Sequence, residues 1–237
     1  MAGLKEYNGH YCESEYEYAF VGFLEAEGWK CSSGNNIPRI TKRDVLIADD
    51  FKTFISDTNP DLTEDEITQI FDNVRLAGGE SDFATLHKIY GWMTNGIKFT
   101  PHDGIPRTIP LINFEKDDID KNIFRVVNQF TIEYTNNGQK KNRRPDVILF
   151  VNGMPLCIIE LKNPADANAT VYDAWEQINI RYWRDIPHLL HYCPLACISD
   201  GVKTRLGTVR TPYEHFYAWR KVNDEDAVST LPFAETE

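Results

Sequence analysis

The sequence predicts an α/β fold in which a mixed central sheet is flanked by helices. Two observations carry this prediction. The first hundred residues contain amphipathic, helix-like segments, whereas residues 125–160 contain three strand-like runs. A helix-like segment at 170–184 and a short apolar strand at 195–199 follow. Strands interrupted by a helix are typical of an α/β core whose sheet mixes parallel and antiparallel pairs.

Three helices are expected in the N-terminal part of the chain. Residues 14–27 place their aromatic side chains on one helical face, and residues 64–75 carry an apolar stripe of the same period. Thr63 and Glu66 form a capping box at the start of the second segment. A third helix is expected over 82–94, so this part of the chain is mostly helical.

The strands are expected in the second half of the chain. Residues 125–134 alternate apolar and polar side chains, and 147–151 and 156–159 are unbroken apolar runs. Unbroken runs are typical of central strands that are buried on both faces. Asn152-Gly153 is a strong hairpin signal between these two runs. A closing helix is expected around 216–220.

Composition limits the classes of protein to which the chain can belong. Its 237 residues are 42% hydrophobic, which suits one large or two small globular domains. A net charge of −11 argues against nonspecific nucleic-acid binding over the whole surface. The five cysteines show no zinc-ligand spacing, and no signal peptide or long apolar span occurs. We therefore expect a reducing, cytoplasmic setting and no membrane partner.

Two carboxylates and a lysine lie at the end of the expected hairpin. Asp146 precedes its first strand, and Glu160 and Lys162 end its second. A buried unpaired charge is costly, so charges there are usually paired or hold a metal. Two carboxylates can hold Mg²⁺ for phosphodiester hydrolysis, and a lysine can orient the attacking water or stabilise charge. The alternative is an ordinary ion pair between Glu160 and Lys162 at a strand end.

Strand register decides whether the two carboxylates can share a metal. With a plain two-residue loop at Asn152-Gly153 and regular pairing, Asp146 and Glu160 point to opposite faces. One extra residue brings them to the same face. A shared site therefore predicts either a three-residue loop or a β-bulge near Gly153. Lys162 shares the face of Glu160 because it lies two residues further along.

Two further features fit a phosphodiesterase. A basic cluster in this acidic chain immediately precedes Asp146 and consists of Lys140, Lys141, Arg143 and Arg144. These residues can contact DNA phosphates, although a solvated turn is the simpler interpretation. Gln177 and Tyr182 lie on the helix that follows the hairpin. They can orient a substrate or a metal-bound water, or they can be hydrogen-bond partners within the core.

Several runs of sequence carry a more specific resemblance. They are residues 124–130, 144–156, 159–164, 174–178, 181–182, 185–187 and 198–201, with the helix at 15–29. Together they resemble the N-terminal nuclease domain of type I restriction enzyme R (motor) subunits. The resemblance covers most of the chain. Residues 30–115 match less obviously, and we interpret them as a mostly helical, family-variable insertion.

This resemblance implies a PD-(D/E)xK, restriction-endonuclease-like core and assigns roles to residues. The implied catalytic triplet is Asp146, Glu160 and Lys162. The Leu161 carbonyl is implied as a further metal ligand. Glu17 is implied as the acid of the N-terminal helix that faces the metal, with Glu15 as its rival.

The family's helix often carries Gln-x-x-x-Tyr, but Gln177 and Tyr182 are five residues apart here. Five residues turn about 140° around an ideal α-helix, so the two side chains would not share a face. Either this helix contains a bulge, or only Gln177 has the family role.

The function implied is a Mg²⁺-dependent endodeoxyribonuclease, with Mn²⁺ as a possible substitute, that cuts double-stranded DNA during ATP-dependent restriction. Methyltransferase and specificity subunits are the implied partners. The chain has no Gly-x-x-x-x-Gly-Lys-Ser/Thr loop, so ATP is expected to bind only in motor domains outside it. Residues 1–223 are then the nuclease domain, 224–237 an acidic linker, and the chain by itself is expected to have little activity.

Two other functions are open on the residues alone. Another PD-(D/E)xK nuclease, such as a repair or stand-alone enzyme, would cut DNA without partners. A non-catalytic docking module would bind no metal near Asp146.

Overall fold

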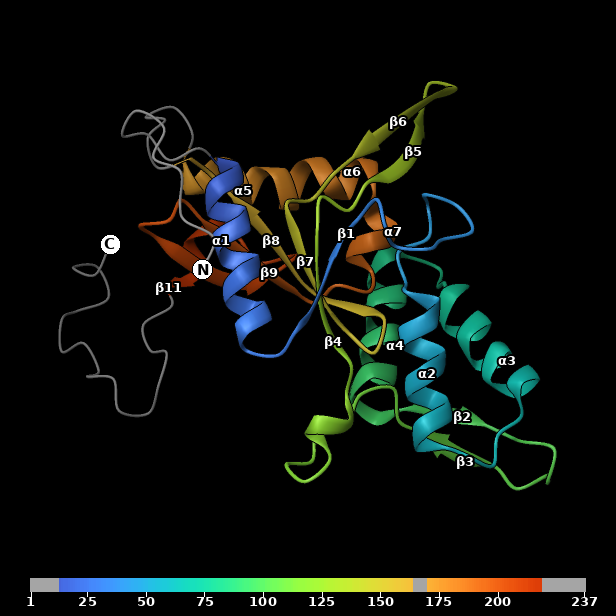
Figure 1. Ribbon diagram of the computed structural model, residues 1–237. Helices are drawn as coiled ribbons and strands as arrows, with labels where there is room; N and C mark the ends of the chain where they lie inside the picture. The colour runs from blue at the N-terminus through green and yellow to red at the C-terminus, as the bar shows by residue number, and fades with distance from the viewer. Residues whose placement is uncertain (1–12, 164–169, 219–237) are drawn as a thin grey trace.

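A seven-stranded mixed sheet forms the centre of the fold, in the order β1-β4-β7-β8-β9-β10-β11 (Figure 1). The computed structural model describes residues 13–163 and 170–218. β1 pairs with β4, and β8 with β9, in parallel, whereas the other neighbours are antiparallel. The predicted α/β class with a mixed sheet is confirmed. The strands are β1 (Lys30–Ser33), β4 (Phe124–Asn128), β7 (Val147–Val151), β8 (Met154–Leu161), β9 (Leu195–Ser199), β10 (Thr204–Thr208) and β11 (Tyr217–Ala218).

Helices cover both faces of this sheet (Figure 1). α1 (Glu13–Ala26) packs on one face, against a cluster that includes Val126 and Val147. The other face carries the larger cluster, to which all the remaining helices except α6 contribute fully buried or nearly buried side chains. These helices are α2 (Ala48–Thr58), α3 (Glu64–Arg75), α4 (Asp82–Asn95), α5 (Val171–Glu176), the π-helix Gln177–Tyr182, α6 (Trp183–Asp185) and α7 (Pro187–Leu190).

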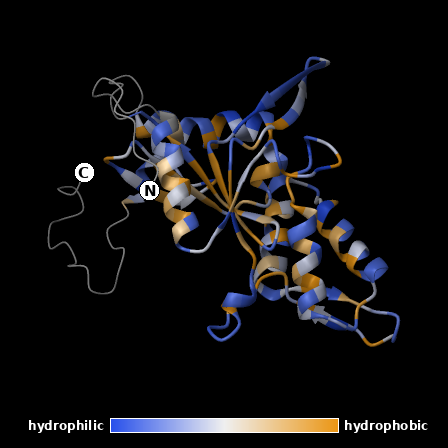
Figure 2. Ribbon diagram, viewed as in Figure 1, coloured by the Kyte–Doolittle hydropathy of each residue, from blue (hydrophilic) through white to orange (hydrophobic). Residues whose placement is uncertain are grey.

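The two-sided burial explains the unbroken apolar runs of the central strands. On β7, Val147 belongs to the cluster under α1, and the next residue, Ile148, belongs to the cluster on the opposite face. Successive side chains of a strand point to opposite faces, so both must be apolar when both faces are covered. Figure 2 shows these apolar strands enclosed between the helices.

The best-defined sequence signals gave the correct elements. α3 begins after Thr63, whose side chain and Glu66 form the predicted capping box. The helix expected over 82–94 is α4, and the one expected over 14–27 is α1. The sequence did not predict α2 and β1. α2 has no side-chain cap at Ile47, and β1 is four residues long and polar at its end, so neither carries a strong signal.

The single strand expected over 125–134 is wrong. β4 ends at Asn128, and Gln129 adopts a positive φ of 54°, which breaks the strand. β5 (Ile132–Asn136) then leaves the main sheet and pairs with β6 (Gln139–Arg143) in a hairpin that projects from the body of the molecule (Figure 1). A second separate hairpin joins β2 (Ile97–Phe99) to β3 (Arg107–Ile109), and a 3₁₀ turn spans Ile119–Lys121.

The closing helix around 216–220 is also wrong for the part that is described. A 3₁₀ turn at Tyr213–His215 is followed by the short strand β11 instead. Residues 219 and 220, and the linker expected at 224–237, lie outside the described residues. No helix in the described ranges is long and apolar enough to cross a membrane.

Candidate active site

The β7–β8 hairpin closes through a two-residue turn. Asn152 and Gly153 both have positive φ, 51° and 74°, as a type I′ turn requires. Asn152 is fully buried, and its side-chain amide donates to the carbonyl of Leu111 over 2.9 Å. At Gly153, any Cβ atom would lie 2.2 Å from the carbonyl oxygen of Ile47, so only glycine fits there. The three-residue loop considered from the sequence is therefore wrong.

The other predicted solution, a β-bulge, is confirmed. The pairing shifts between Leu149 and Phe150, which leaves Leu156 as an extra residue on β8. Beyond the bulge Val147 pairs with Ile159, so the next residues in the ladder, Asp146 and Glu160, are opposite each other on one face. The register that a shared site requires is present.

Glu160 is fully buried and surrounded by hydrogen-bond donors. Its carboxylate accepts from the Tyr182 hydroxyl over 2.7 Å and from the Gln177 amide nitrogen over 2.5 Å. Burial raises the pKa of Glu160 well above its usual value, and the neighbouring carboxylate of Asp146 raises it further. Lys162 is linked to the same group, because its ammonium donates to the Gln177 side-chain oxygen over 3.2 Å.

Asp146 is held from the backbone. Its side chain accepts from the N–H of Leu161 over 2.9 Å, and its own carbonyl accepts from the N–H of Gln129 over 2.8 Å. Asp146 is 8% exposed and Glu160 is fully buried, so Asp146 is the more accessible residue of the pair. The backbone N–H of Leu161 thus positions Asp146. The metal-ligand role implied for the Leu161 carbonyl stays a prediction.

A π-helix accounts for the five-residue spacing of Gln177 and Tyr182. The stretch Gln177–Tyr182 is hydrogen-bonded as a π-helix, in which residues five apart approach each other. The Gln177 amide nitrogen consequently donates to the Tyr182 hydroxyl over 2.9 Å, and both side chains reach Glu160. The bulge alternative for this helix is confirmed.

Glu17 enters the same region from α1. It is 4% exposed, and its carboxylate accepts from the side-chain amides of Asn128, over 2.8 Å, and Gln129, over 2.5 Å. Burial is the main cause of its raised pKa, and Asp146 is close enough to add to it. Glu15 is half-buried. The sequence did not single out the amides at 128 and 129, because both contacts to Glu17 join residues more than a hundred positions apart.

The predicted basic cluster divides into two kinds of residue. Lys140, Lys141 and Arg144 are exposed. Arg143 is half-buried, and its guanidinium forms an ion pair with Asp185, with Nε 2.7 Å from the carboxylate. The charge of Arg143 is therefore paired with Asp185 within the protein.

A polar cavity of about 420 Å³ lies beside the carboxylate pair. It is lined by Thr131, Asn142, Arg143, Arg144, Gln177, Arg181 and Tyr182. The sequence did not predict Arg181 as a site residue. Its neighbours give no signal of a π-helix, so they do not show that Arg181 faces this cavity.

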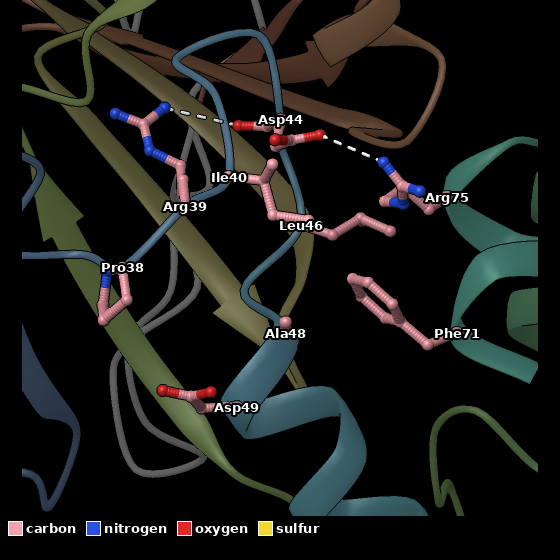
Figure 3. A pocket seen from close by; sticks show the side chains of 9 residues that line it. All are labelled: Pro38, Arg39, Ile40, Asp44, Leu46, Ala48, Asp49, Phe71 and Arg75. Carbon is pink, nitrogen blue, oxygen red and sulfur yellow. Dashed lines mark hydrogen bonds and ion pairs between the residues drawn. The ribbon is translucent and has the colours of Figure 1, made fainter. Parts of the chain in front are cut away.

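A second cavity, of about 330 Å³, shares no residue with this region (Figure 3). It lies between the loop around Arg39 and helix α3. Arg39 donates to the Asp44 carbonyl over 3.3 Å, and the Asp44 carboxylate pairs with Arg75 over 3.6 Å. Both arginines of this cavity are thus paired with Asp44.

The donor set suits a hard divalent cation with few protein ligands. In the stretches 13–163 and 170–218, no group of three or more His, Cys, Asp or Glu side chains is placed to hold a metal ion. Mg²⁺ keeps several waters and is commonly bound through one or two carboxylates, which Asp146 and Glu160 supply. After burial, the charge of Asp146 is the next largest cause of the raised pKa of Glu160. A cation between the two carboxylates would offset this repulsion.

Comparison with known proteins places the chain in a family. The family model described as type I restriction enzyme R protein N terminus matches residues 11–215. The chain is 34% identical over 225 residues to the protein assigned as type I restriction enzyme MjaIXP endonuclease subunit of Methanocaldococcus jannaschii. It is 27% identical over 233 residues to the type I restriction enzyme HindI endonuclease subunit of Haemophilus influenzae.

The alignments cover 91% and 93% of the chain but only 21% of each relative. The chain thus spans about a fifth of the length of these proteins. Because the family model matches most of the chain, the chain belongs to the family of type I restriction enzyme R protein N termini.

Proposed function

We propose that this chain is the part of a type I restriction enzyme that hydrolyses DNA phosphodiester bonds, with Mg²⁺ or, in its place, Mn²⁺. The observation that carries the proposal is the fully buried Glu160 beside Asp146, with Lys162 joined to it through Gln177. A buried carboxylate without a neutralising partner is strongly unfavourable. An ordinary strand-end ion pair would place Lys162 on Glu160, but here the ammonium contacts the Gln177 oxygen.

Asp146 and Glu160 would hold the ion, and the Leu161 carbonyl and Glu17 are the further candidates. The bound ion would lower the pKa of a coordinated water and neutralise charge on the phosphate. The protein contributes the geometry. The Leu161 N–H fixes Asp146, and the Tyr182 hydroxyl and Gln177 amide fix Glu160.

Lys162 would orient the attacking water or stabilise the negative charge that develops on the phosphate. Gln177 limits where that ammonium can lie, because its oxygen accepts from Lys162 while both of its N–H groups are used on Glu160 and Tyr182. Gln177 therefore links the positions of Lys162 and Glu160.

Double-stranded DNA is the proposed substrate, and methyltransferase and specificity subunits are the proposed partners, in the cytoplasm. ATP would bind in parts of the longer protein that lie outside this chain. Sequence recognition would come from the specificity subunit, so the contacts made here would be with the DNA backbone rather than with bases.

The test uses the restriction complex assembled with the full-length subunit. Asp146→Ala or Lys162→Ala should abolish DNA cleavage and leave ATP hydrolysis intact, while the exposed Asp120→Ala should leave both unchanged. Cleavage that survives both site substitutions would contradict the assignment. Efficient cutting by the 237-residue chain alone would instead favour a stand-alone nuclease.

A further inference from the structure

We propose that the polar cavity beside Gln177 binds a second phosphate of the DNA backbone, next to the one that is cut. Arg144 and Arg181 would be the positively charged residues that hold it. This inference rests on the proposed function, because it takes DNA as the substrate. It extends that function to Arg181, which belongs to neither the catalytic triplet nor the basic cluster.

The cavity adjoins the carboxylate pair through shared side chains. Gln177 and Tyr182 line it, and the same two side chains hydrogen-bond to Glu160. A ligand in the cavity is thus separated from Glu160 by one layer of side chains. The opposite wall comes from the base of the β5–β6 hairpin, where Asn142 and Arg143 end β6. β5 also contacts α6, the helix that follows the π-helix (Figure 1).

The charges in the cavity are unbalanced. Three arginines line it, and no Asp or Glu is among its described lining residues. Arg143 is neutralised by Asp185, which also pairs with Arg184. Arg144 and Arg181 are exposed, and within residues 13–163 and 170–218 neither has a hydrogen-bond or ion-pair partner. Glu17 lies within charge–charge range of Arg144, and Asp173 within range of Arg181, but neither carboxylate lines the cavity. Two guanidiniums without a contacting acid therefore face one cavity in a chain of net charge −11.

This chemistry fits a phosphate better than a metal or a carbonyl group. Guanidinium stays protonated at all relevant pH values and can donate two parallel hydrogen bonds to phosphate oxygens. Asn142 and Thr131 add neutral donors to the same wall. Since Lys162 is turned toward Gln177 and the carboxylate pair, the arginines are free to hold a different phosphate from the one being cut.

The π-helix is what places Arg181 in this cavity together with its neighbours. Arg181 follows Gln177 by four residues and immediately precedes Tyr182. The wide turn brings Gln177 and Tyr182 together, and Arg181 lines the cavity beside them. The same helical irregularity therefore serves both the carboxylate pair and the proposed phosphate site.

The test measures binding of the 237-residue chain to a short DNA duplex of arbitrary sequence, in EDTA, as a function of salt concentration. Without divalent ions the duplex is not cut, so the result does not depend on the metal site. Arg144→Ala and Arg181→Ala should each reduce the slope of log affinity against log salt by about 1, whatever the duplex sequence. Arg181→Lys should keep the slope and weaken binding, because charge remains and the paired hydrogen bonds are lost.

Arg210→Ala is the matched control, because Arg210 carries the same charge but pairs with Asp82 outside the cavity. It should leave the slope unchanged. The proposal is overturned if the unsubstituted chain does not bind the duplex at low salt, or if both cavity variants keep its slope. It is also overturned if the control changes the slope equally, or if the loss occurs only with duplexes that contain guanine, which would indicate base contacts.

These outcomes are separable from those for the proposed function. A loss of slope would support the phosphate site even if Asp146→Ala still cleaved DNA in the complex. Conversely, unchanged slopes would remove the phosphate site and leave the metal-dependent cleavage assignment untouched.

Discussion

The Gln177 side-chain amide lies 2.9 Å from the Tyr182 hydroxyl, although the two residues are five apart in the chain. In an α-helix they would be about 140° apart around the axis, and only one could face Glu160. The π-helix brings both to the same carboxylate. π-turns of this kind occur frequently at functional sites, where the altered spacing aims side chains that regular helix would separate.

Tyr182→Phe should lower DNA cleavage by the assembled complex by roughly 10- to 100-fold, since the buried Glu160 loses one of its two side-chain donors. ATP hydrolysis should be unchanged. Tyr192→Phe is the control, because this buried hydroxyl donates to the Val74 carbonyl on the helical side of the core. Equal cleavage by the Tyr182→Phe and unsubstituted complexes would show that this hydroxyl has no part in the site.

Glu17→Gln should weaken Mn²⁺ binding to the chain by roughly tenfold in a calorimetric titration, because Glu17 lies near Asp146 and adds negative charge to the site. Glu15→Gln serves as its matched control and should bind as the unsubstituted chain does. Asp146→Ala should remove the binding heat. The reverse order of the two glutamate variants would make Glu15 the acid that faces the metal.

Gly153→Ala should destabilise the fold by about 3 kcal/mol or more, measured by urea unfolding. Its φ of 74° strains any other residue, and a Cβ atom would also lie 2.2 Å from the Ile47 carbonyl oxygen. Gly138→Ala has the same φ of 74° with nothing within 4 Å, so it should lose only about 1 kcal/mol. Similar losses for both variants would show that the loop before α2 can move aside.

Asp185→Asn should lower the free energy of unfolding at neutral pH by about 1–2 kcal/mol, because the carboxylate holds Arg143 and Arg184. The two guanidiniums lower the pKa of Asp185 to about 2, from an ordinary 3.8. As pH falls from 3.8 to about 2, Asp185 takes up a proton in the unfolded chain before it does so in the folded chain. Its contribution to stability is therefore complete above pH 3.8 and is lost as pH falls toward 2. Unfolding curves should therefore depend less on pH between 2 and 4 in the variant, and an unchanged dependence would contradict the assignment.

The sequence predicted the parts of the fold that rest on local signals. The capping box at Thr63 and the Asn152-Gly153 turn are chemical features of neighbouring residues, and both were found where expected. The break at Gln129 was not predictable, because a glutamine at positive φ is held there by long-range contacts to Glu17 and Asp146. α2 was missed for a similar reason, since its stability comes from burying Phe51 and Phe54 rather than from a cap.

The candidate site was predictable to the extent that motif and alternation define it. Spacing and the strand period made Asp146, Glu160 and Lys162 candidates, and the family resemblance implied their catalytic role, which stays a prediction. The bulge was expected, but its position at Leu156 depends on how β8 packs between β7 and β9. Arg181 was not expected, because its place in the cavity follows from the π-helix and from the position of the β5–β6 hairpin, and the spacing of the sequence does not give the second of these.

Because of the bulge at Leu156, Asp146 and Glu160 share a face only for the present number of residues between them, or for a number that differs from it by two. Losing or gaining one residue in this stretch would rotate Glu160 and Lys162 together onto the face covered by α1, whatever the side chains between them. A compensating second change of one residue would return both to the face of Tyr182. In this hairpin, an exchange of one apolar side chain for another keeps Asp146 and Glu160 on one face, whereas a change of length by one residue separates them.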